Sequence, residues 1–330
     1  MKPLRKKKDE GFVLVDKKSC ILIVGHRDAL ENSLTGYFAR QKYTNVFSSS
    51  SLKLDFLKQN AVYNFFKKHK LDYVFLGSIR SGGIQANQKF AAEFIYENLE
   101  CQNNVIHAAY KTGVKKLLYF SSSCAYFKEC PQPMKEEHLL TGTLEPTSEP
   151  YAIAKIAGTK LCQSYKRQYG FDAIVAMPAT LYGPGADDNM ETAHVMGALM
   201  AKFRRAVLRG EREVFVWGTG KPRREFLFTD DFVSACVFLM KNYTDAEMIN
   251  VGCGYDVTIK GLAEMIKAVS GFKGKIIYDA SKPDGTMKKL MDNSRLTKLG
   301  WKPRVSLEEG IRKTVQWYGS QFGRRLPNCD

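Results

Sequence analysis

The chain has 330 residues, of which 44% are hydrophobic and 25% are charged, an ordinary composition for a globular protein. Its length exceeds one average domain, so we expect one large unit or two closely joined units. No apolar run approaches the roughly 18 residues of a membrane-spanning helix, and the apolar stretch Phe12–Val15 is too short for a signal-peptide core. We therefore expect a cytoplasmic protein that meets no membrane, with a basic tail at residues 1–18.

The formal net charge of +16 comes from lysines and arginines spread over the whole length. Because no recognised nucleic-acid motif accompanies them, we expect an anionic small-molecule ligand rather than a nucleic acid. The eight cysteines form no C-x-x-C pair and show no zinc-ligand spacing. Free thiols in a reducing compartment, and no metal site, are therefore expected.

The first half of the chain alternates short apolar runs with helix-length segments. Strands are predicted near 20–24, 44–47, 72–76, 116–120 and 173–177, and helices near 29–41, 60–69, 90–111 and around 151–155. This alternation predicts an α/β fold with a doubly wound parallel sheet of the Rossmann type, in a domain covering residues 19–184.

The pattern becomes less regular from about residue 185. Helices are expected near 193–208, 258–270 and 307–321, with short strands near 214–216 and 248–251. These segments predict a smaller α/β C-terminal lobe, residues 185–330, that holds the substrate. In open parallel sheets ligands bind beyond the carboxyl ends of the strands, and Gly25, Gly77, Ser122 and Pro178 all lie at such ends.

Tyr151 and Lys155 are four residues apart in a helical segment, so they project from the same face. A tyrosine has a pKa of about 10 in water, but an adjacent cation stabilises the phenolate and lowers that pKa toward the working range. The pair could therefore transfer protons. By itself it is more often a chance pair on an amphipathic helix, so its sequence context must decide.

Several further motifs follow in one order along residues 20–320. They are Ser122-Ser123-Cys124, the run from Leu144 to Lys155, Met177-Pro178, Leu181-Tyr182-Gly183-Pro184, His194-Val195, Val216 to Gly220, Arg224 to Leu227 and Lys282 to Thr286. With Tyr151 and Lys155 they resemble the extended short-chain dehydrogenase/reductase family, and within it the GDP-L-fucose synthases. The resemblance implies a 3,5-epimerase/4-reductase of a GDP-linked 4-keto sugar, and a homodimer.

The resemblance also implies roles for individual residues. Tyr151 would protonate the C4 oxygen as hydride arrives from NADPH, Lys155 would assist it and hold the cofactor ribose, and Ser122 would hold the same oxygen. Cys124 and His194 would remove and return protons at C3 and C5, because a thiol and an imidazole both titrate near neutrality. Outside that pattern Cys124 would be read as a buried strand-end residue and His194 as a surface residue.

Two larger sets follow from the same resemblance. The cofactor would contact Gly25, Arg27, Ser48, Phe120, Ser121, Lys155, Pro178, Leu181 and His194. The nucleotide diphosphate-sugar would contact Lys202, Trp217, Arg224 and Lys289, which supply cations and an aromatic surface. A solvated lysine is an equally good interpretation of Lys202 and of Lys289.

The dinucleotide loop departs from the family pattern. The family has G-x-x-G-x-x-G where this chain has Gly25-His26-Arg27-Asp28-Ala29-Leu30-Glu31, so two glycines are replaced. Asp28 and Glu31 form a capping-box pattern whose carboxylates could satisfy the helix amides that would otherwise bind pyrophosphate. Ser48–Ser51 stands where some members place an arginine for the 2′-phosphate, which leaves NADP(H) or NAD(H) open.

We therefore expect an NADP(H)-dependent epimerase/4-reductase of a GDP-4-keto-deoxy sugar. Two alternatives stay open: a non-redox 3,5-epimerase with weakened cofactor binding, and a non-catalytic homologue that binds a nucleotide sugar.

Overall fold

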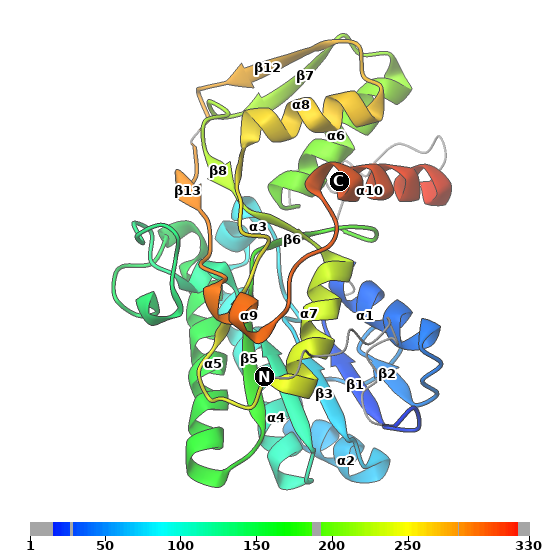
Figure 1. The fold of residues 1–330 in the computed structure, drawn as a ribbon, viewed down its shortest axis with the longest axis vertical. Helices are drawn as coiled ribbons and strands as arrows, with labels where there is room; N and C mark the ends of the chain where they lie inside the picture. Colours follow the sequence, from blue (N-terminus) through cyan, green and yellow to red (C-terminus); the bar gives the residue numbers. More distant parts are fainter. Residues whose placement is uncertain (1–15, 27–28, 187–192, 283, 323–330) are drawn as a thin grey trace, which may run out of the picture.

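The computed structural model describes residues 16–26, 29–186, 193–282 and 284–322. They form two lobes stacked along the long axis of the molecule (Figure 1). Within these ranges no helix is long and apolar enough to cross a bilayer. Arg27, Asp28 and most of the N-terminal tail lie outside the described residues, so their predicted roles stay predictions.

The first lobe is built on a six-stranded sheet with the order β10-β5-β4-β3-β1-β2, in which every neighbouring pair is parallel. The strands are β1 Ile21–Val24, β2 Val46–Ser48, β3 Tyr73–Leu76, β4 Lys116–Phe120, β5 Ala173–Pro178 and β10 Ile249–Val251. Four of the strands, β1, β4, β5 and β10, are buried along all or nearly all of their length, as expected for a sheet covered on both faces. The predicted doubly wound α/β fold is confirmed.

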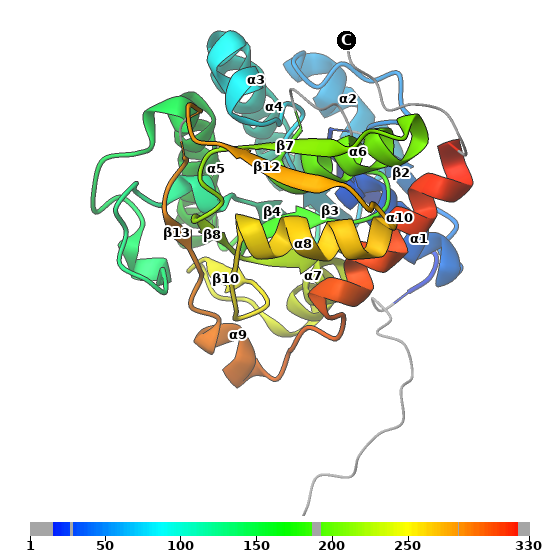
Figure 2. The ribbon, with the colours of Figure 1, turned by 90° about the horizontal axis from the view of Figure 1, so that it is seen from above.

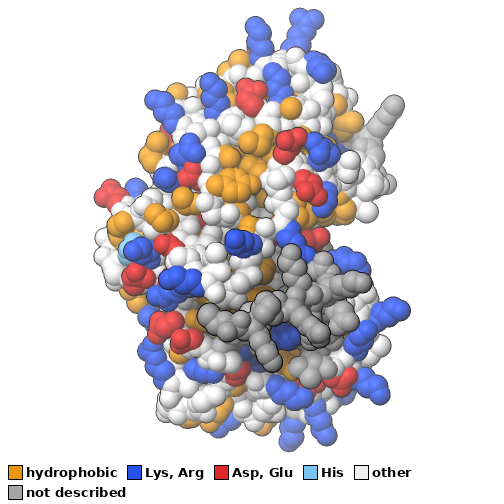
Figure 3. Space-filling model, in the orientation of Figure 1, with side chains coloured by type: hydrophobic (Ala, Val, Ile, Leu, Met, Phe, Trp, Pro, Cys, Tyr) orange, Lys and Arg blue, Asp and Glu red, His pale blue; other side chains and the backbone are white. Residues whose placement is uncertain are grey.

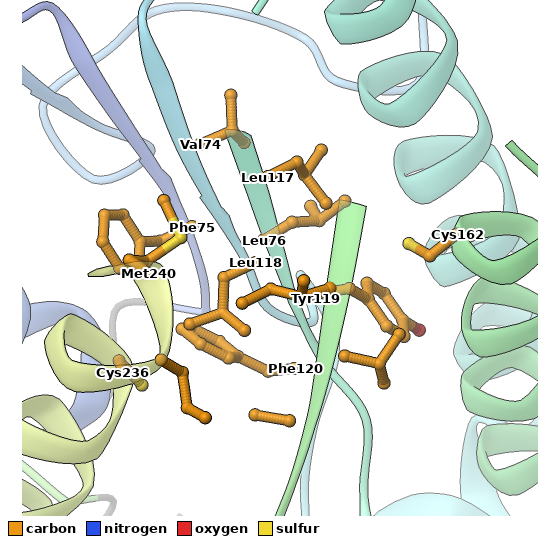
Figure 4. Packing of buried hydrophobic residues seen from close by; sticks show 14 of the residues in the cluster. Val74, Phe75, Leu76, Leu117, Leu118, Tyr119, Phe120, Cys162, Cys236 and Met240 are labelled. Atoms are coloured by element: carbon orange, nitrogen blue, oxygen red, sulfur yellow. The ribbon is translucent and has the colours of Figure 1, made fainter. Parts of the chain in front are cut away.

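Helices cover both faces of this sheet (Figure 1). They are α1 Ala29–Arg40 and α7 Thr229–Asn242 on one face, and α2 Gln59–His69, α4 Ala91–Lys111 and α5 Glu149–Tyr169 on the other. Successive strand residues point to opposite faces. Figure 4 shows this for β4, where Phe120 points toward α7 and Tyr119 toward α5.

The second lobe has its own apolar core, separate from that of the sheet. Its main elements are α6 Val195–Arg209, β7 Glu213–Trp217, α8 Ile259–Ser270, β12 Lys275–Asp279 and α10 Leu307–Phe322. Short strands and a helix complete it and its connections: β6 Thr180–Tyr182, β8 Arg223–Arg224, β9 Phe226–Phe228, β11 Val257–Thr258, β13 Lys288–Lys289, α9 Ser294–Leu299. Seen from above, α8, β7 and β12 extend across the first lobe (Figure 2).

The chain passes between the lobes more than once. The sixth strand of the large sheet, β10, and the helix α7 both come from residues beyond 184, and β10 pairs with β5 through Ile249 and Ala176. The proposed domain division at 184/185 thus remains a prediction. The large sheet nevertheless includes a strand, β10, from residues after that division. A separate helix, α3 Ile84–Lys89, also precedes α4 where the sequence predicted one helix beginning at Phe90.

On the face of Figure 3, lysine and arginine side chains are scattered over both lobes rather than gathered into one stripe. This distribution on the visible face matches the even spread of lysines along the sequence.

Candidate active site at the carboxyl edge of the sheet

Tyr151 lies in the first turn of α5, which has Pro150 at its start, where proline fits a helix well. The half-buried ring packs edge-on against Phe94, with ring centroids 6.1 Å apart. The phenol oxygen is 3.0 Å from the hydroxyl of Ser78, two residues beyond β3. Tyr151 therefore points to the carboxyl edge of the sheet.

Lys155 is 1% exposed, so its ammonium group needs partners inside the protein. Its Nζ donates a hydrogen bond to the carbonyl oxygen of Phe120 over 2.8 Å. The same nitrogen lies 4.7 Å from the ring centre of Tyr119 and 5.9 Å from that of Tyr151. The charge is thereby fixed beside the phenol at the end of β4.

Gly158 makes this arrangement possible one turn further along α5. A Cβ atom at this position would lie 2.4 Å from the hydroxyl of Tyr119 and 2.6 Å from Oε1 of Gln102. These two groups are hydrogen-bonded to each other over 2.7 Å. The missing side chain therefore lets Tyr119 lie against the helix that carries Lys155.

The residues after β4 turn through a short 3-10 segment, Ser123–Ala125. The Ser122 hydroxyl accepts the backbone N–H of Cys124 over 3.3 Å, which fixes the turn. Ser121 is buried, and its hydroxyl accepts from Thr159 of α5 over 3.0 Å. Ser122 and Cys124 are half-buried at the same edge as Tyr151. We call the set Ser78, Ser122, Cys124, Tyr151 and Lys155 the catalytic edge.

Arg224 of β8 connects the catalytic edge to the second lobe. Burial lowers the pKa of Arg224, and the negative charges that Cys124 and Asp284 can carry act in the opposite direction. The interaction places the thiol within electrostatic reach of this guanidinium. Lys289 stands beside Arg224 in the β8–β13 pair, so two cations share one strand register.

Trp217, at the end of β7, presents an aromatic surface that is 48% exposed. The ammonium groups of Lys202 and Lys282 lie 5.3 Å and 5.6 Å from its ring centre. Lys202 also donates to the carbonyl of Phe215 over 3.0 Å, and burial lowers its pKa. An exposed indole with two cations near its ring suits a flat, negatively charged ligand.

His194 is the N-cap residue of α6, and its side chain is exposed. Its carbonyl accepts from Ala198, which starts the helix. Residues 187–192, which end two positions before it, lie outside the described part. The predicted opposition of His194 and Cys124 therefore stays a prediction.

The remaining predicted cofactor residues follow the strand ends. Pro178 closes β5 and Leu181 lies in β6, where it pairs with Leu227. The Phe120 ring packs against Phe232 of α7, with centroids 5.3 Å apart. Phe120 and Pro178 are thus the last residues of β4 and β5, and Leu181 follows shortly after β5.

The ends of β1 and β2 form a second polar region, which we call the adenosine crevice and define as Gly25, Glu31 and Ser48–Ser51. The Ser49 hydroxyl accepts from the Gly25 amide over 3.0 Å and donates to the Gly25 carbonyl over 2.9 Å. The Glu31 carboxylate accepts the Ser50 amide over 2.7 Å, a partner that the sequence did not suggest.

A family model described as the NAD dependent epimerase/dehydratase family matches residues 21–252. This range includes both the adenosine crevice and the catalytic edge. The chain belongs to this family. The resemblance that the motifs indicate is thereby confirmed.

Relatives within the family are similar over nearly the whole chain. GDP-L-fucose synthase 1 of Arabidopsis thaliana is 50% identical, over 92% of this chain and 94% of the relative. GDP-L-fucose synthase of Escherichia coli is 43% identical, over 91% and 97%. A solved GDP-mannoheptose C4 reductase of Campylobacter jejuni with NADP bound has a TM-score of 0.83 at 35% identity, over 92% of this chain and 99% of that one.

Two features of the site were missed from the sequence. Ser78 bonds Tyr151 from a strand end next to Gly77, and the rule that ligands gather at such ends could have indicated it. The Glu31–Ser50 contact joins residues 19 apart in sequence, and no local pattern predicts that pairing.

Proposed function

We propose that this member of the family is an NADP(H)-dependent 3,5-epimerase/4-reductase of a GDP-linked 4-keto-6-deoxy sugar. The observation that carries the proposal is the catalytic edge. The Tyr151 hydroxyl is 3.0 Å from that of Ser78, the buried Lys155 ammonium bonds the Phe120 carbonyl at the end of β4, and Ser122 and Cys124 lie in the turn after that strand. The names of the GDP-L-fucose synthase relatives support the same activity.

In the reduction, Tyr151 gives its proton to the C4 oxygen of the sugar. Lys155 stabilises the negative charge left on the phenol oxygen, and its position is fixed by the Phe120 carbonyl. The hydroxyl of Ser122 holds the same sugar oxygen. A bound nicotinamide cofactor supplies hydride at C4.

The donor set at the nicotinamide end fits such a cofactor. Lys155 offers an ammonium group to ribose hydroxyls, and Phe120, Ser121, Pro178 and Leu181 line the strand ends around it. At the other end Gly25 and Ser48 lie beside β1 and β2. The NADP bound by the Campylobacter reductase supports this cofactor.

In the epimerisation, Cys124 and His194 exchange protons with C3 and C5. The neighbouring C4 ketone makes these protons acidic because it stabilises the enolate. Inversion requires a base on one face of the ring and an acid on the other, so one group comes from each lobe: Cys124 from the turn after β4 and His194 from the start of α6.

The GDP portion is held by the second lobe. Arg224 and Lys289 supply charge for the diphosphate, and Trp217 with Lys202 supplies a flat surface with a cation above it. Desolvation of Arg224, which lowers its pKa, strengthens its attraction for a phosphate that replaces water.

We also propose a cytoplasmic homodimer. The seven cysteines in the described ranges are free thiols, as in a reducing compartment. Exposed apolar side chains on α4 and α5, Tyr96, Ile153 and Tyr169, offer a surface for a second copy. Light scattering with gel filtration tests the mass, and a monomer at micromolar concentration would refute the dimer.

The adenosine crevice favours one second candidate, a non-redox 3,5-epimerase. There the Glu31 carboxylate occupies the Ser50 amide, which would weaken cofactor binding while leaving Cys124 and His194 unaffected. A non-catalytic homologue that binds a nucleotide sugar is the remaining alternative.

One experiment separates the three. Purified protein is incubated with GDP-4-keto-6-deoxymannose in heavy water, with and without NADPH. Oxidation of NADPH with deuterium at C3 and C5 supports the proposed function. Deuterium uptake without NADPH oxidation supports the epimerase. The absence of both deuterium uptake and NADPH oxidation would overturn both catalytic assignments.

A further inference from the structure

Glu31 lies in the first turn of α1 and is 1% exposed. A buried carboxylate needs hydrogen-bond donors. One is the backbone N–H of Ser50, which reaches Oε1 over 2.7 Å. Since Ser50 follows β2, which ends at Ser48, this side chain brings a negative charge from α1 to the carboxyl end of β2.

The surrounding crevice is filled by the chain itself. A Cβ atom at Gly25 would lie 3.3 Å from Cβ of Glu31 and 3.4 Å from its Oε2. The Ser48 hydroxyl is 3.0 Å from that of Ser50 and donates to that of Ser51 over 3.1 Å. Glu31 thus lies between the end of β1 and a loop of amide and hydroxyl donors.

The end of β2 is where a dinucleotide-binding sheet recognises the adenosine ribose. An acidic residue there accepts a hydrogen bond from a 2′-hydroxyl, whereas a 2′-phosphate needs donors and positive charge. Here the amide of Ser50 is bonded to a carboxylate, and that carboxylate would repel an added phosphate.

We propose that Glu31 is a specificity-determining residue that lowers the affinity of this chain for a 2′-phosphorylated dinucleotide relative to the same dinucleotide without the phosphate. The inference rests on the proposed dinucleotide site. It predicts that the chain prefers NADP(H) over NAD(H) less strongly than a relative with glycine at this position does.

The test is calorimetric titration of the full chain with NADP⁺ and with NAD⁺, which differ in the 2′-phosphate alone. Glu31→Gln keeps the size of the side chain and an oxygen for the Ser50 amide but removes the charge. We expect NADP⁺ to bind about tenfold more tightly and NAD⁺ to change less than about threefold. Glu264→Gln, an equal charge change at an exposed position of α8, should alter neither affinity.

An equal change for both nucleotides, or an unchanged ratio, would overturn the proposal, as would a failure of either protein to bind NADP⁺. Glu31→Ala is the second variant. Provided that its thermal unfolding is as cooperative as that of the parent, its ratio of NADP⁺ to NAD⁺ affinity should shift in the same direction. Deuterium exchange at C3 and C5 of the sugar needs neither NADP⁺ nor NAD⁺. It therefore tests the proposed function separately from the ratio of NADP⁺ to NAD⁺ affinity.

Discussion

The catalytic edge and the adenosine crevice lie at the same end of one sheet, yet their polar groups are used differently. At the catalytic edge the hydroxyl of Tyr151 meets another hydroxyl, Ser78, and the ammonium of Lys155 is fixed beside it by a carbonyl. In the crevice a carboxylate and a serine hydroxyl bond backbone groups, through Glu31 with Ser50 and Ser49 with Gly25.

The comparison separates residues proposed for chemistry from residues proposed for cofactor binding. The edge carries the residue types that the proposed proton transfer needs, whereas the crevice has Glu31 where the family pattern has a glycine. Changes at the edge should therefore alter chemistry, and changes in the crevice should alter binding.

The largest effect is expected from Tyr151→Phe, which removes the proton that the proposed mechanism transfers to the C4 oxygen. Hydride transfer should fall by about 10²–10⁴-fold, the range for loss of a general acid. Deuterium exchange at C3 and C5 should persist, because Cys124 and His194 are untouched. NADPH absorbance and mass spectrometry measure the two rates, and an equal loss of both would break the division of roles.

Cys124→Ser should lower the rate of deuterium exchange by about 100-fold, since a serine hydroxyl is a far weaker base than a thiolate. Cys20→Ser is the matched control: this cysteine is also half-buried but precedes β1, at the opposite end of the sheet. An identical effect of both substitutions would show that general destabilisation, not proton transfer, is being measured.

Gly158→Ala tests whether packing holds the edge in place. The added methyl group would meet the Tyr119 hydroxyl at 2.4 Å, and such overpacking costs about 1–3 kcal/mol of unfolding free energy. Gly319→Ala in α10 is the control, since nothing lies within 4 Å of that position and alanine favours a helix. In urea unfolding, the free energy of unfolding should be lower for Gly158→Ala than for wild type, and equal to or higher than wild type for Gly319→Ala.

The smallest effect concerns Glu136, a buried carboxylate that sharpens the contrast with Glu31. Burial raises the pKa of Glu136, although the Asn250 amide and Arg295 oppose this. The folded state thus favours the neutral acid, and the stability this contributes is complete below the unfolded pKa of about 4.3 and is lost as pH rises through the folded pKa. In urea unfolding, Glu136→Gln should therefore gain stability relative to wild type as the pH rises above about 4.5, and a difference that stays constant with pH would contradict this.

Local patterns predicted the scaffold well. The strand at 116–120 has its predicted bounds, and the three helices predicted beyond residue 184 begin and end within two residues of α6, α8 and α10, because hydrophobic periodicity is a property of neighbouring residues. The helices α7 and α9 were not predicted. The return of Ile249–Val251 to the large sheet was not predicted, since its pairing with β5 joins residues more than 70 positions apart.

The site divides in the same way. Tyr151, Lys155, Ser122 and Cys124 are found at one edge because strand ends and a helical spacing place them there. The bonds from Glu31 to Ser50 and from Tyr151 to Ser78 depend on how separate strands align, which no stretch of sequence states.

A crystal structure of Cys124→Ser with NADP⁺ and GDP-4-keto-6-deoxymannose would test the account most directly. We predict that the C4 oxygen lies within about 3 Å of the Tyr151 and Ser122 hydroxyls, with the GDP against Trp217 and Arg224. A sugar ring bound away from the Tyr151 hydroxyl would contradict the assignment of the catalytic edge.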